Sequence, residues 1–454
     1  MSTIVAISTA PGIGGIGIVR MSGEQSFDIL KKIFVPKDKN AFENINGYTI
    51  KYGTINDGSN VIDEVLVSFF KEPKSYTTEN MCEINSHGGI VVLNKILELC
   101  LKNGAVLAEA GEFTKRAFLN GRIDLSQAEA VIDVINSKTE KEALVATKQL
   151  EGGISESIQA IRKKVLSILA DIEATIDYPE YDLEEVTNVR ILNVLNDVKM
   201  DLNKLENTFD NGKILREGIK TVILGRPNAG KSSLLNLILN EERAIVTSIE
   251  GTTRDTIEEY ISIKGVPFKI IDTAGIRTTD DQVEIIGVQK ALNLANECDI
   301  VIGIFDINKK LDEEDHRIID VLKEKNSIIV LNKNDLDSNI EEKYINSLNI
   351  PVVYISTIKK EGIDKLYEEM YKIYKFDESV IDNETIVSNE RHKNHIRKAM
   401  ENVDISIGTI NEGLPIDMIS TNIKEVIEEL GKITGDSVTE DIINEIFSKF
   451  CLGK

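Results

Sequence analysis

The sequence predicts a multidomain chain of mixed α/β and α+β class. Short β-type runs separated by turn residues extend to about residue 118, amphipathic helices free of glycine and proline follow, and a strand–helix alternation begins at Ile219. Strands that alternate with helix-length connections are typical of a parallel sheet. We expect this sheet to be mixed but mainly parallel. Because helices return near the C-terminus, we expect this α/β domain to be inserted in a helical bundle domain. The expected domains are 1–118 (α+β), 119–214 (helical, first part), 215–376 (α/β) and 377–454 (helical, second part).

Hydrophobic periodicity places the individual elements. In the first domain, β-type runs at Thr3–Ser8, Gly15–Val19 and Val61–Phe70 precede one helix near Ile90–Leu101. Helical spacing then covers Gln127–Gln149, Ile158–Ile176 and Val186–Phe209. The expected strands of the α/β domain are Thr221–Leu224, Phe268–Ile271, Ile300–Phe305, Ile328–Leu331 and Val352–Ile355. The last helices are expected around Ile423–Leu430 and Asp441–Phe450.

Composition excludes several classes of protein. The 454 residues carry a formal net charge of −22, which argues against a uniformly basic surface for nucleic acid. The four cysteines form no C-x-x-C pair, so neither a disulfide framework nor a zinc site is expected. His392 and His395 share a helix face, which we interpret as a solvated face rather than a metal site. No apolar run reaches the ~18 residues of a membrane span and no secretory signal is recognisable, so a cytoplasmic protein is expected.

The strongest chemical signal is a phosphate-binding loop. Gly225-Arg226-Pro227-Asn228-Ala229-Gly230-Lys231-Ser232 follows an apolar strand and opens a helix, the context that a P-loop requires. Glycines let backbone N–H groups surround phosphates, and the helix N-terminus adds partial positive charge. Lys231 is predicted to reach the β- and γ-phosphates, and Ser232 to bind Mg²⁺. The alternative is a glycine-rich turn that matches by accident.

Two further motifs define the metal and the base. Asp272 ends the strand Phe268–Ile271 and opens Asp272-Thr273-Ala274-Gly275, as a Mg²⁺-holding carboxylate does. Asp335, in Asn332-Lys333-Asn334-Asp335, can accept both donors of the guanine edge, which selects GTP over ATP. Thr253, in Gly251-Thr252-Thr253-Arg254-Asp255, is expected to complete the Mg²⁺ shell, unless it is an ordinary loop threonine. Ile276 stands where small GTPases often carry a water-orienting glutamine, so another group must act.

Two stretches outside these motifs carry a resemblance. They are Gly111-Glu112-Phe113-Thr114-Lys115-Arg116-Ala117-Phe118-Leu119-Asn120-Gly121-Arg122 and the tail Phe450-Cys451-Leu452-Gly453-Lys454. With them the chain resembles, along its whole length, the bacterial MnmE (TrmE) family of tRNA-modification GTPases, which belongs to the TrmE-Era-EngA-type GTPases. The resemblance implies a GTPase domain inserted in a helical domain, in agreement with the periodicity. It also implies that the predicted GTP-binding residues are Asn228, Ala229, Gly230, Lys231, Ser232, Ser233, Thr247, Ser248, Ile249, Thr252, Thr253, Asp272, Thr273, Ala274, Gly275, Asn332, Lys333, Asp335 and Ser356.

For catalysis the resemblance implies a potassium-activated GTPase whose GTPase domains pair across a dimer. The K⁺ site matches Asn228, Thr247, Ile249 and Thr252, and the cation stands in for an arginine finger. Glu284 matches the glutamate that orients water indirectly, so the expected catalytic residues are Glu284, Asn228 and Lys231. From the residues alone, Asn228 equally suits a simple turn position, and Glu284 is typical of a solvated acidic surface.

The resemblance also assigns the N-terminal domain and the partners. That domain is expected to form a homodimer and to bind a tetrahydrofolate derivative, of 5-formyl or methylene type, through Arg20, Glu83, Arg122 and Lys454. With the FAD-dependent protein MnmG, in a heterotetramer, such proteins add a (carboxymethyl)aminomethyl group to C5 of the wobble uridine of certain tRNAs. Arg20 and Arg122 could pair a folate carboxylate bidentately, or be ordinary surface ion-pair residues. Cys451 is either a reactive thiol or a small packed residue; the residues favour the second.

Three stretches depart from the family pattern. Ile13 stands where a basic residue is common, Tyr76-Thr77-Thr78-Glu79-Asn80 replaces Tyr-Thr-Gly-Glu-Asp, and Ser356-Thr357-Ile358 replaces Ser-Ala-Lys. The first two bear on the folate pocket and the third on nucleotide affinity. Gly12-x-Gly14-x-x-Gly17 formally matches a dinucleotide fingerprint, but Ile18-Val19-Arg20 continues a strand instead of opening a helix. We interpret His87 as part of a turn rather than as a catalytic histidine.

One basic stretch stands out in an acidic chain. Arg391-His392-Lys393-Asn394-His395-Ile396-Arg397-Lys398, called the basic island below, is expected to meet a polyanion such as the tRNA backbone, unless neighbouring acids pair it. Two functions remain open. One is GTP hydrolysis coupled to tRNA modification, and the other is a GTP-switched ribosome-assembly or RNA-binding factor. The first domain and the C-terminal tail favour the first.

Overall fold

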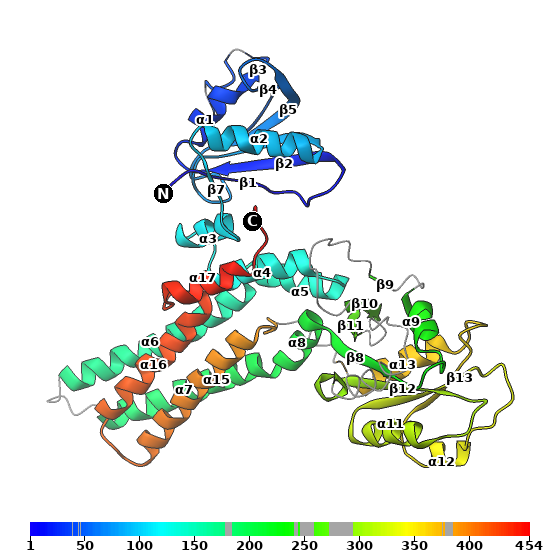
Figure 1. Cartoon of the computed structure of the whole chain (residues 1–454). Helices are drawn as coiled ribbons and strands as arrows, with labels where there is room; N and C mark the ends of the chain where they lie inside the picture. The colour runs from blue at the N-terminus through cyan, green and yellow to red at the C-terminus, as the bar shows by residue number, and fades with distance from the viewer. Residues whose placement is uncertain are drawn as a thin grey trace. The chain divides into compact units, whose positions relative to one another are not determined.

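The computed structural model describes residues 1–38, 40–43, 45, 47–177, 184–239, 244–245, 258–271, 294–374, 376 and 385–454. These residues form two compact units (Figure 1). The first comprises Met1–Ile132, Leu150–Ile191 and Ile405–Lys454, and the second comprises Asp133–Gln149 and Leu192–Asp404. Each unit therefore combines a sheet with segments of the helices that flank it in the sequence.

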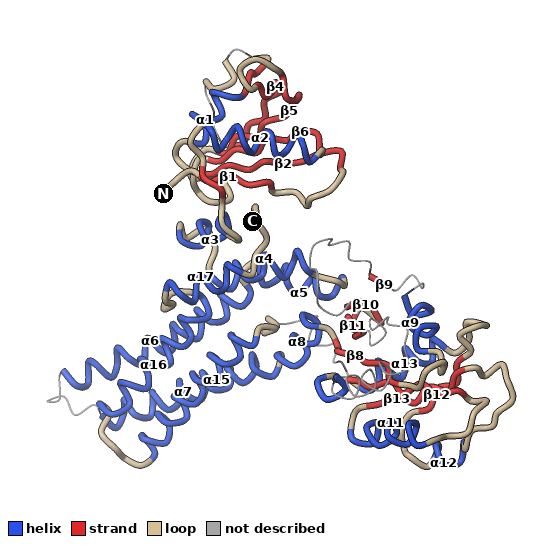
Figure 2. The backbone as a smooth tube through the Cα atoms, in the orientation of Figure 1, coloured by secondary structure: helices blue, strands red, loops and turns tan. Residues whose placement is uncertain are grey.

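The first unit contains a seven-stranded sheet in the order β3-β4-β5-β6-β2-β1-β7. Its neighbours pair antiparallel except β1 and β7. The strands are β1 Ile4–Ile7, β2 Gly14–Ser22, β3 Phe34–Pro36, β4 Tyr48–Asn56, β5 Val61–Phe70, β6 Met81–Gly88 and β7 Val106–Leu107. Helices α1 Ser26–Ile33 and α2 Ile90–Lys102 cover one face (Figure 2). Alternate strand residues such as Val65, Val67 and Phe69 are buried against them, as period-2 patterning predicts.

The helices of the first unit follow the sheet and return at the C-terminus. α3 Glu112–Leu119 and α17 Glu440–Ser448 pack together, and α16 Asp417–Thr434 packs along α6 Gly153–Asp177. Phe447 and Phe450 share a core with Ala117 of α3 and with Ala128 of α4 Leu125–Asn136. This core anchors the last residues of the chain beside the sheet domain.

The second unit contains a seven-stranded mixed sheet in the order β14-β13-β12-β8-β11-β10-β9. Its strands are β8 Ile219–Leu224, β9 Ala244–Ile245, β10 Glu258–Ile263, β11 Val266–Ile271, β12 Ile300–Asp306, β13 Ser327–Asn332 and β14 Val352–Ile355. Strands β11, β8, β12, β13 and β14 are parallel, whereas β9 and β10 join antiparallel. The five predicted strands and the mixed, mainly parallel sheet are thus confirmed.

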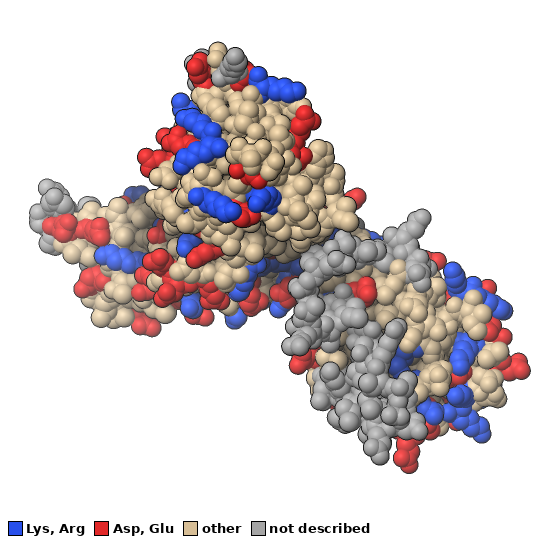
Figure 3. Space-filling view, turned by 45° about the horizontal axis from the view of Figure 1, so that its top comes forward, with Lys and Arg blue, Asp and Glu red and all other residues tan. Residues whose placement is uncertain are grey.

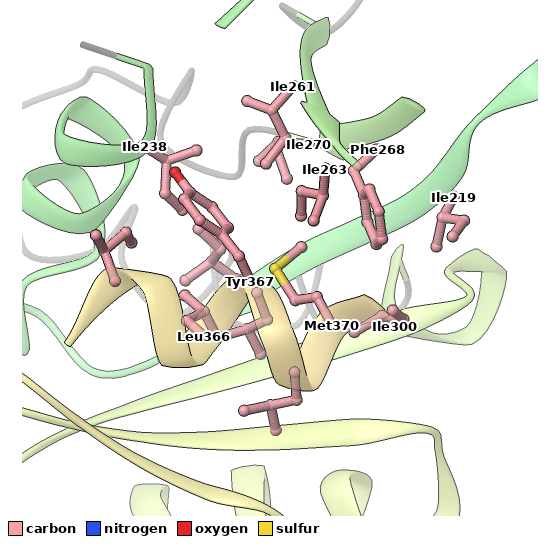
Figure 4. Close-up of a cluster of buried hydrophobic side chains, with 14 of the residues drawn as sticks. Ile219, Ile238, Ile261, Ile263, Phe268, Ile270, Ile300, Leu366, Tyr367 and Met370 are labelled. Atoms are coloured by element: carbon pink, nitrogen blue, oxygen red, sulfur yellow. The ribbon is translucent and has the colours of Figure 1, made fainter. Parts of the chain in front are cut away.

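Helices cover both faces of this sheet. α9 Lys231–Leu239 and α13 Ile363–Ile373 close one core, where Tyr367 and Met370 pack against Phe268 and its neighbours (Figure 4). α11 Glu313–Glu324 and α12 Glu342–Asn346 close the other. β12 is buried at all seven positions, as a strand covered on both faces must be. The carboxyl ends of β8, β12 and β13 therefore share one edge of the sheet.

Further helices among the described residues are α5 Glu140–Leu150, α7 Glu184–Asn207, α8 Phe209–Glu217 and α15 Glu390–Asn411. The periodic segment Gln127–Gln149 is two helices and not one, which corrects the sequence prediction. Residues 137–139 interrupt it, where the Thr139 hydroxyl accepts from Glu142 N at 3.2 Å and the Glu142 carboxylate from Lys138 N at 2.5 Å. A Thr-x-x-Glu pattern of this kind starts a new helix. None of the helices in the described residues is long and apolar enough to cross a membrane.

Candidate nucleotide site

The phosphate loop links β8 to α9, as predicted. Gly225 runs so close to β12 that a Cβ on it would lie 2.5 Å from the Ile304 side chain and 2.6 Å from its carbonyl oxygen. Asn228 has φ +62° and Gly230 has φ +107°, so two left-handed residues shape the turn. A Cβ on Gly230 would lie 2.1 Å from Asn332 Nδ2. Only glycine therefore fits at these two contact points.

Lys231 starts α9 and folds back over the loop. Its Nζ donates to the carbonyl oxygens of Gly225 at 2.5 Å and of Arg226 at 2.8 Å. Ser232 and Ser233 follow in the first turn of α9, and both are exposed. The loop thus gathers a lysine charge, helix N–H groups and a serine hydroxyl at one place, which are the groups that bind a phosphate chain with its metal.

The base-selecting segment lies beside this loop. The Asn332 side chain is buried, donates from Nδ2 to the Ala229 carbonyl oxygen at 2.9 Å and accepts from Thr357 N at 3.3 Å. Asn334 N donates to Ile355 O at 3.1 Å. These bonds bring together the three segments that the sequence assigned to one nucleotide.

Asp335 is held by the segment that begins at Ser356. The Ser356 hydroxyl donates to Asp335 Oδ1 at 2.5 Å and accepts from Lys359 N at 3.2 Å. The hydrogen bond from Ser356 lowers the pKa of Asp335, so its carboxylate is ionised at neutral pH. Ile358, where the family pattern has lysine, is 79% exposed. An ionised carboxylate at this edge is the acceptor that the two donors of guanine require.

Sequence reasoning missed three acidic side chains that hold this site. Asp306, at the end of β12, pairs with Lys333 Nζ at 2.5 Å. It could have been found, because Asp306 follows Ile300–Phe305 just as Asp272 follows Phe268–Ile271. Arg226 pairs with Asp312 at 2.8 Å and with Asp315 at 3.2 Å.

The acidic partners of Arg226 lie at the start of α11. Asp312 and Asp315 form a reciprocal capping box there. Burial raises the pKa of Asp315, against the opposing effect of its hydrogen bonds with Asp312 and Arg226. Arg226 therefore fixes the second residue of the phosphate loop to this helix start. No sequence signal marked the contact.

Several predicted residues lie outside the described residues. They are Thr247, Ser248, Ile249, Thr252, Thr253, Asp272, Thr273, Ala274, Gly275, Ile276 and Glu284. In the sequence, those from Thr247 to Thr253 lie between β9 and β10, and those from Asp272 to Glu284 follow β11. Strand β11 is the parallel neighbour of β8. The placement of these residues at the nucleotide remains a prediction.

A second site forms in the first unit around Tyr76. Arg20 pairs with Glu83 at 2.7 Å across β2 and β6, and Arg20 Nη1 donates to Gly453 O at 3.2 Å. The Arg20 guanidinium lies 5.6 Å and that of Arg122 4.4 Å from the centre of the Tyr76 ring. The structure thus gathers both arginines, Glu83 and the C-terminal tail.

The tail reaches this place through its own backbone. Phe113 N donates to Lys454 O at 3.2 Å, and the Ser8 hydroxyl donates to Gly453 O at 3.0 Å. Burial, reinforced by Arg20, lowers the pKa of Lys454. Cys451 is exposed, which does not fit the packed residue that the sequence favoured. The four residues predicted for folate therefore lie close together around Tyr76.

The departures from the family pattern have structural consequences in this unit. Thr78 adopts φ +63°, the left-handed conformation in which the usual glycine is unstrained. Its neighbour Glu79 pairs with the buried Arg116 at 3.2 Å. Ile13 is fully exposed in the segment that leads into β2. His87 lies within strand β6 and not in a turn, which corrects the sequence interpretation. Its backbone N–H donates to Asp63 at 2.7 Å, and its ring Nδ1 lies 2.7 Å from the same carboxylate.

Two cations of the basic island, Lys393 and Arg397, lie beside acidic side chains. Arg397 lies 3.4 Å from Glu206, and Lys393 lies 4.0 Å from Asp210 with its Nζ 3.9 Å from the centre of the Phe209 ring. His392 is fully buried, which corrects the interpretation of its face as solvated. On the face in Figure 3, basic and acidic side chains are interspersed. Within the described part of the chain, no group of three His, Cys, Asp or Glu side chains could hold a metal. These contacts favour the alternative in which neighbouring acids pair the island.

Comparison with known proteins identifies the family of the chain. Residues 3–122 match the family described as GTP-binding protein TrmE N-terminus, and residues 125–451 match the MnmE helical domain. The tRNA modification GTPase MnmE of Clostridioides difficile (strain 630) is 50% identical, over 100% of this chain and 99% of that protein. The same-named proteins of Acetivibrio thermocellus and Thermoanaerobacter pseudethanolicus are 49% and 48% identical with equal coverage.

Among solved structures, the G domain of the T. maritima FeoB iron transporter matches 34% of this chain and 98% of its own length at 23% identity. Its TM-score of 0.25 adds nothing to the fold described above. Family membership is established instead by the curated relatives and by both family matches, since they cover the chain almost from end to end. The chain belongs to the MnmE family of tRNA modification GTPases.

Proposed function

We propose that this chain binds and hydrolyses GTP with K⁺ as activator and couples the reaction to tRNA modification. The observation that carries the nucleotide part is the convergence of three segments at Asn332, which contacts Ala229 and Thr357. Beside it, the ionised Asp335 offers one carboxylate to the two adjacent donors of guanine. Adenine presents a different edge and would leave this carboxylate without its donors.

The chain's own groups account for phosphate binding. Lys231 and the N–H groups at the start of α9 neutralise the β- and γ-phosphates. Ser233, Ser248, Thr273, Ala274 and Gly275 are proposed to line the nucleotide. The proposed Mg²⁺ ligands are Ser232, Thr253 and Asp272, and the exposed hydroxyl of Ser232 fits a hard cation. When bound, Mg²⁺ supplies charge neutralisation at the transferring phosphoryl group.

Hydrolysis needs a group in place of the missing glutamine. Asn228 is exposed at a left-handed turn of the P-loop, where its amide oxygen suits K⁺. Thr247, Ile249 and Thr252 are proposed to complete that site, and K⁺ supplies positive charge at the phosphates when bound. Glu284 is proposed to orient the attacking water indirectly, because Ile276 cannot do so. Pairing of GTPase domains from two copies would complete the site.

The potassium proposal has a direct test. GTP hydrolysis is measured in K⁺ and in Na⁺ for the unaltered chain, for Asn228→Ala, and for Asn236→Ala as a control exposed on α9. We expect K⁺ to stimulate the unaltered chain and Asn236→Ala by about tenfold or more, and Asn228→Ala hardly at all. Equal rates in K⁺ and Na⁺ for the unaltered chain would contradict the proposal.

The first unit is proposed to bind a tetrahydrofolate derivative, of 5-formyl or methylene type, as a one-carbon source. Arg20, Arg122 and Lys454 gather positive charge that suits the glutamyl carboxylates, and Glu83 fixes Arg20. Tyr48, Ile50 and Leu66 are exposed on the sheet face opposite α1 and α2. An apolar face of this kind supports a homodimer through this domain.

The proposed reaction partner is the FAD-dependent protein MnmG, in a heterotetramer. Together they would add a (carboxymethyl)aminomethyl group to C5 of the wobble uridine of certain tRNAs. Support comes from family membership over the whole chain and from the charged residues gathered around Tyr76. The domain division at 118, 214 and 376 is part of the same proposal.

The tRNA proposal is tested by mass spectrometry of wobble uridine in tRNA from a strain that lacks this chain. We expect the modification to be absent and to return when the chain is supplied. Unchanged tRNA together with altered ribosome assembly would favour the GTP-switched assembly factor.

A further inference from the structure

Asp306 and Lys333 lie at the ends of neighbouring parallel strands. β12 and β13 pair in register up to Asp306 and Asn332, and Lys333 is the next residue. Lys333 Nζ lies 2.5 Å from Asp306 Oδ2. The Asp306 side chain is 7% exposed and that of Lys333 is 28% exposed. The ion pair is therefore shielded on the carboxylate side and open on the lysine side.

The Asp306 carboxylate is itself fixed in place. Its second oxygen, Oδ1, accepts from Asn308 N at 3.1 Å, so both oxygens have donors. The turn that follows is anchored by Ile307 N, which donates to Asn332 O at 3.0 Å. A carboxylate that is buried and hydrogen-bonded in this way has little freedom to move. The position of the Lys333 ammonium group is therefore set by the carboxylate.

Lys333 is also fixed at its backbone. It has φ +65°, a conformation that non-glycine residues adopt rarely and only when the surroundings hold it. Those surroundings are the side-chain bonds of Asn332 and the bond from Asn334 N to Ile355 O. The four-carbon stem of Lys333 is thus held at its backbone end and at its ammonium end. The stem forms an apolar strip two residues before the base-selecting Asp335.

We propose that Asp306 is a positioning residue for the guanine base, which holds the Lys333 ammonium so that the lysine stem lies ready against one face of the base. This rests on the proposed function, in which Asp335 binds the edge of the same base. A lysine already held in one conformation loses little rotamer freedom when the base binds, so affinity rises without any direct contact from Asp306. The competing interpretation is that the pair only neutralises a buried carboxylate at a strand end.

The first test is a double-mutant cycle in the full chain. Asp306→Asn keeps the shape and the acceptor for Asn308 N but removes the charge, and Lys333→Met keeps an apolar stem without an ammonium. We expect Asp306→Asn to weaken GDP binding about tenfold in the unaltered chain and to have no further effect in Lys333→Met. Equal weakening in both backgrounds would overturn the proposal, because Asp306 would then act without Lys333.

A control lies at the other end of the same strand. Asp299 accepts from Lys220 N at 2.9 Å just before β12 begins, at the sheet edge opposite the nucleotide. Asp299→Asn should lower the unfolding temperature but leave GDP affinity unchanged. If it weakened GDP binding as much as Asp306→Asn does, affinity would merely report strand stability and the proposal would fall.

A second comparison leaves Asp306 intact and covers the case in which Asp306→Asn does not fold. Lys333→Met keeps the apolar stem, whereas Lys333→Ser removes it, and both leave the same unpaired carboxylate. We expect Lys333→Ser to bind GDP about tenfold more weakly than Lys333→Met. Equal affinities would overturn the stem's role. An unaltered chain that binds no GDP would overturn the proposed function as well, whereas GDP binding that is unaffected by Asp306→Asn overturns only the present inference.

Discussion

The side-chain amide of Asn332 donates to the carbonyl oxygen of Ala229 at 2.9 Å, although 103 residues separate the two in the sequence. The same side chain accepts from Thr357 N at 3.3 Å. Asn332 is buried, so both bonds are shielded from water. The phosphate loop and the base-selecting segment are thus joined by one amide, and a change at either end should reach the other.

Gly230→Ala should break this link. A Cβ at residue 230 would lie 2.1 Å from Asn332 Nδ2, and φ +107° strains any residue other than glycine. We expect GDP affinity to fall about 100-fold or more, because the Asn332 amide must move and its bond to Ala229 is lost. Titration with a fluorescent guanine nucleotide measures the effect. Gly408→Ala is the matched control, since a Cβ there meets nothing within 4 Å. An unchanged GDP affinity in Gly230→Ala would contradict the prediction, because the Asn332 amide could then move without loss of binding.

Asp335→Asn should change the preferred base. Asparagine can accept only one of the two guanine donors and adds a donor of its own, which matches the extra carbonyl of xanthine. We expect GTP affinity to fall by about 100-fold and xanthosine triphosphate affinity to rise, as measured by competition binding. Asp337→Asn, exposed two residues further on, should change neither. An unaltered base preference in Asp335→Asn would refute the guanine assignment.

The sequence predicted the strands and motifs of this site better than its supporting contacts. Apolar runs and glycine spacing are local signals, so β8, β12 and β13 and the P-loop between β8 and α9 were found where expected. The contact of Asp306 with Lys333 spans 27 residues and that of Arg226 with Asp315 spans 89. Such pairs depend on strand order and on where α11 begins, which periodicity does not encode.

The basic island shows the same limit. A charge run does not indicate which acids will lie beside it, and here the partners Glu206 and Asp210 come from helices almost 200 residues earlier in the sequence. In the first unit, by contrast, the resemblance named Arg20, Glu83, Arg122 and Lys454, and the structure gathers them around Tyr76. Motif similarity therefore carried information about long-range contacts that composition and periodicity lacked.

Glu83→Gln should weaken folate binding in the first unit without changing GTP hydrolysis in the second. Loss of the charge frees Arg20, which is otherwise held at 2.7 Å. We expect binding of a tetrahydrofolate derivative to weaken about tenfold, while GTP hydrolysis stays unchanged because the nucleotide site contains neither residue. Calorimetric titration and a phosphate-release assay measure the two. Glu64→Gln, which alters an exposed partner of Tyr52, should affect neither. Folate binding that is the same in Glu83→Gln and the unaltered chain would show that Glu83 does not contribute to folate binding.

Glu142→Gln should stabilise the second unit at alkaline pH. Burial raises the pKa of Glu142 from 4.5 to about 7, although its bonds from Lys138 N and Thr139 oppose the shift. Between pH 4.5 and about 7 the folded state therefore holds more protons than the unfolded state, and the free energy of unfolding falls as pH rises through this window. The destabilisation by Glu142 is absent below pH 4.5 and complete above pH 7. Glutamine is neutral throughout and still offers an acceptor to Lys138 N.

We therefore expect Glu142→Gln to resemble the unaltered chain at pH 4.5 and to be more stable by about 1 kcal/mol at pH 8, a value reduced from the full shift because water reaches part of the side chain. Hydrogen exchange of the backbone amides of α5 measures the free energy of opening of this helix directly. Glu140→Gln, exposed on the first turn of the same helix, is the control and should show no such pH-dependent gain. A gain at pH 8 that is equally large at pH 4.5 would mean that Gln packs better than Glu at this position, and that ionisation of Glu142 is not what destabilises α5.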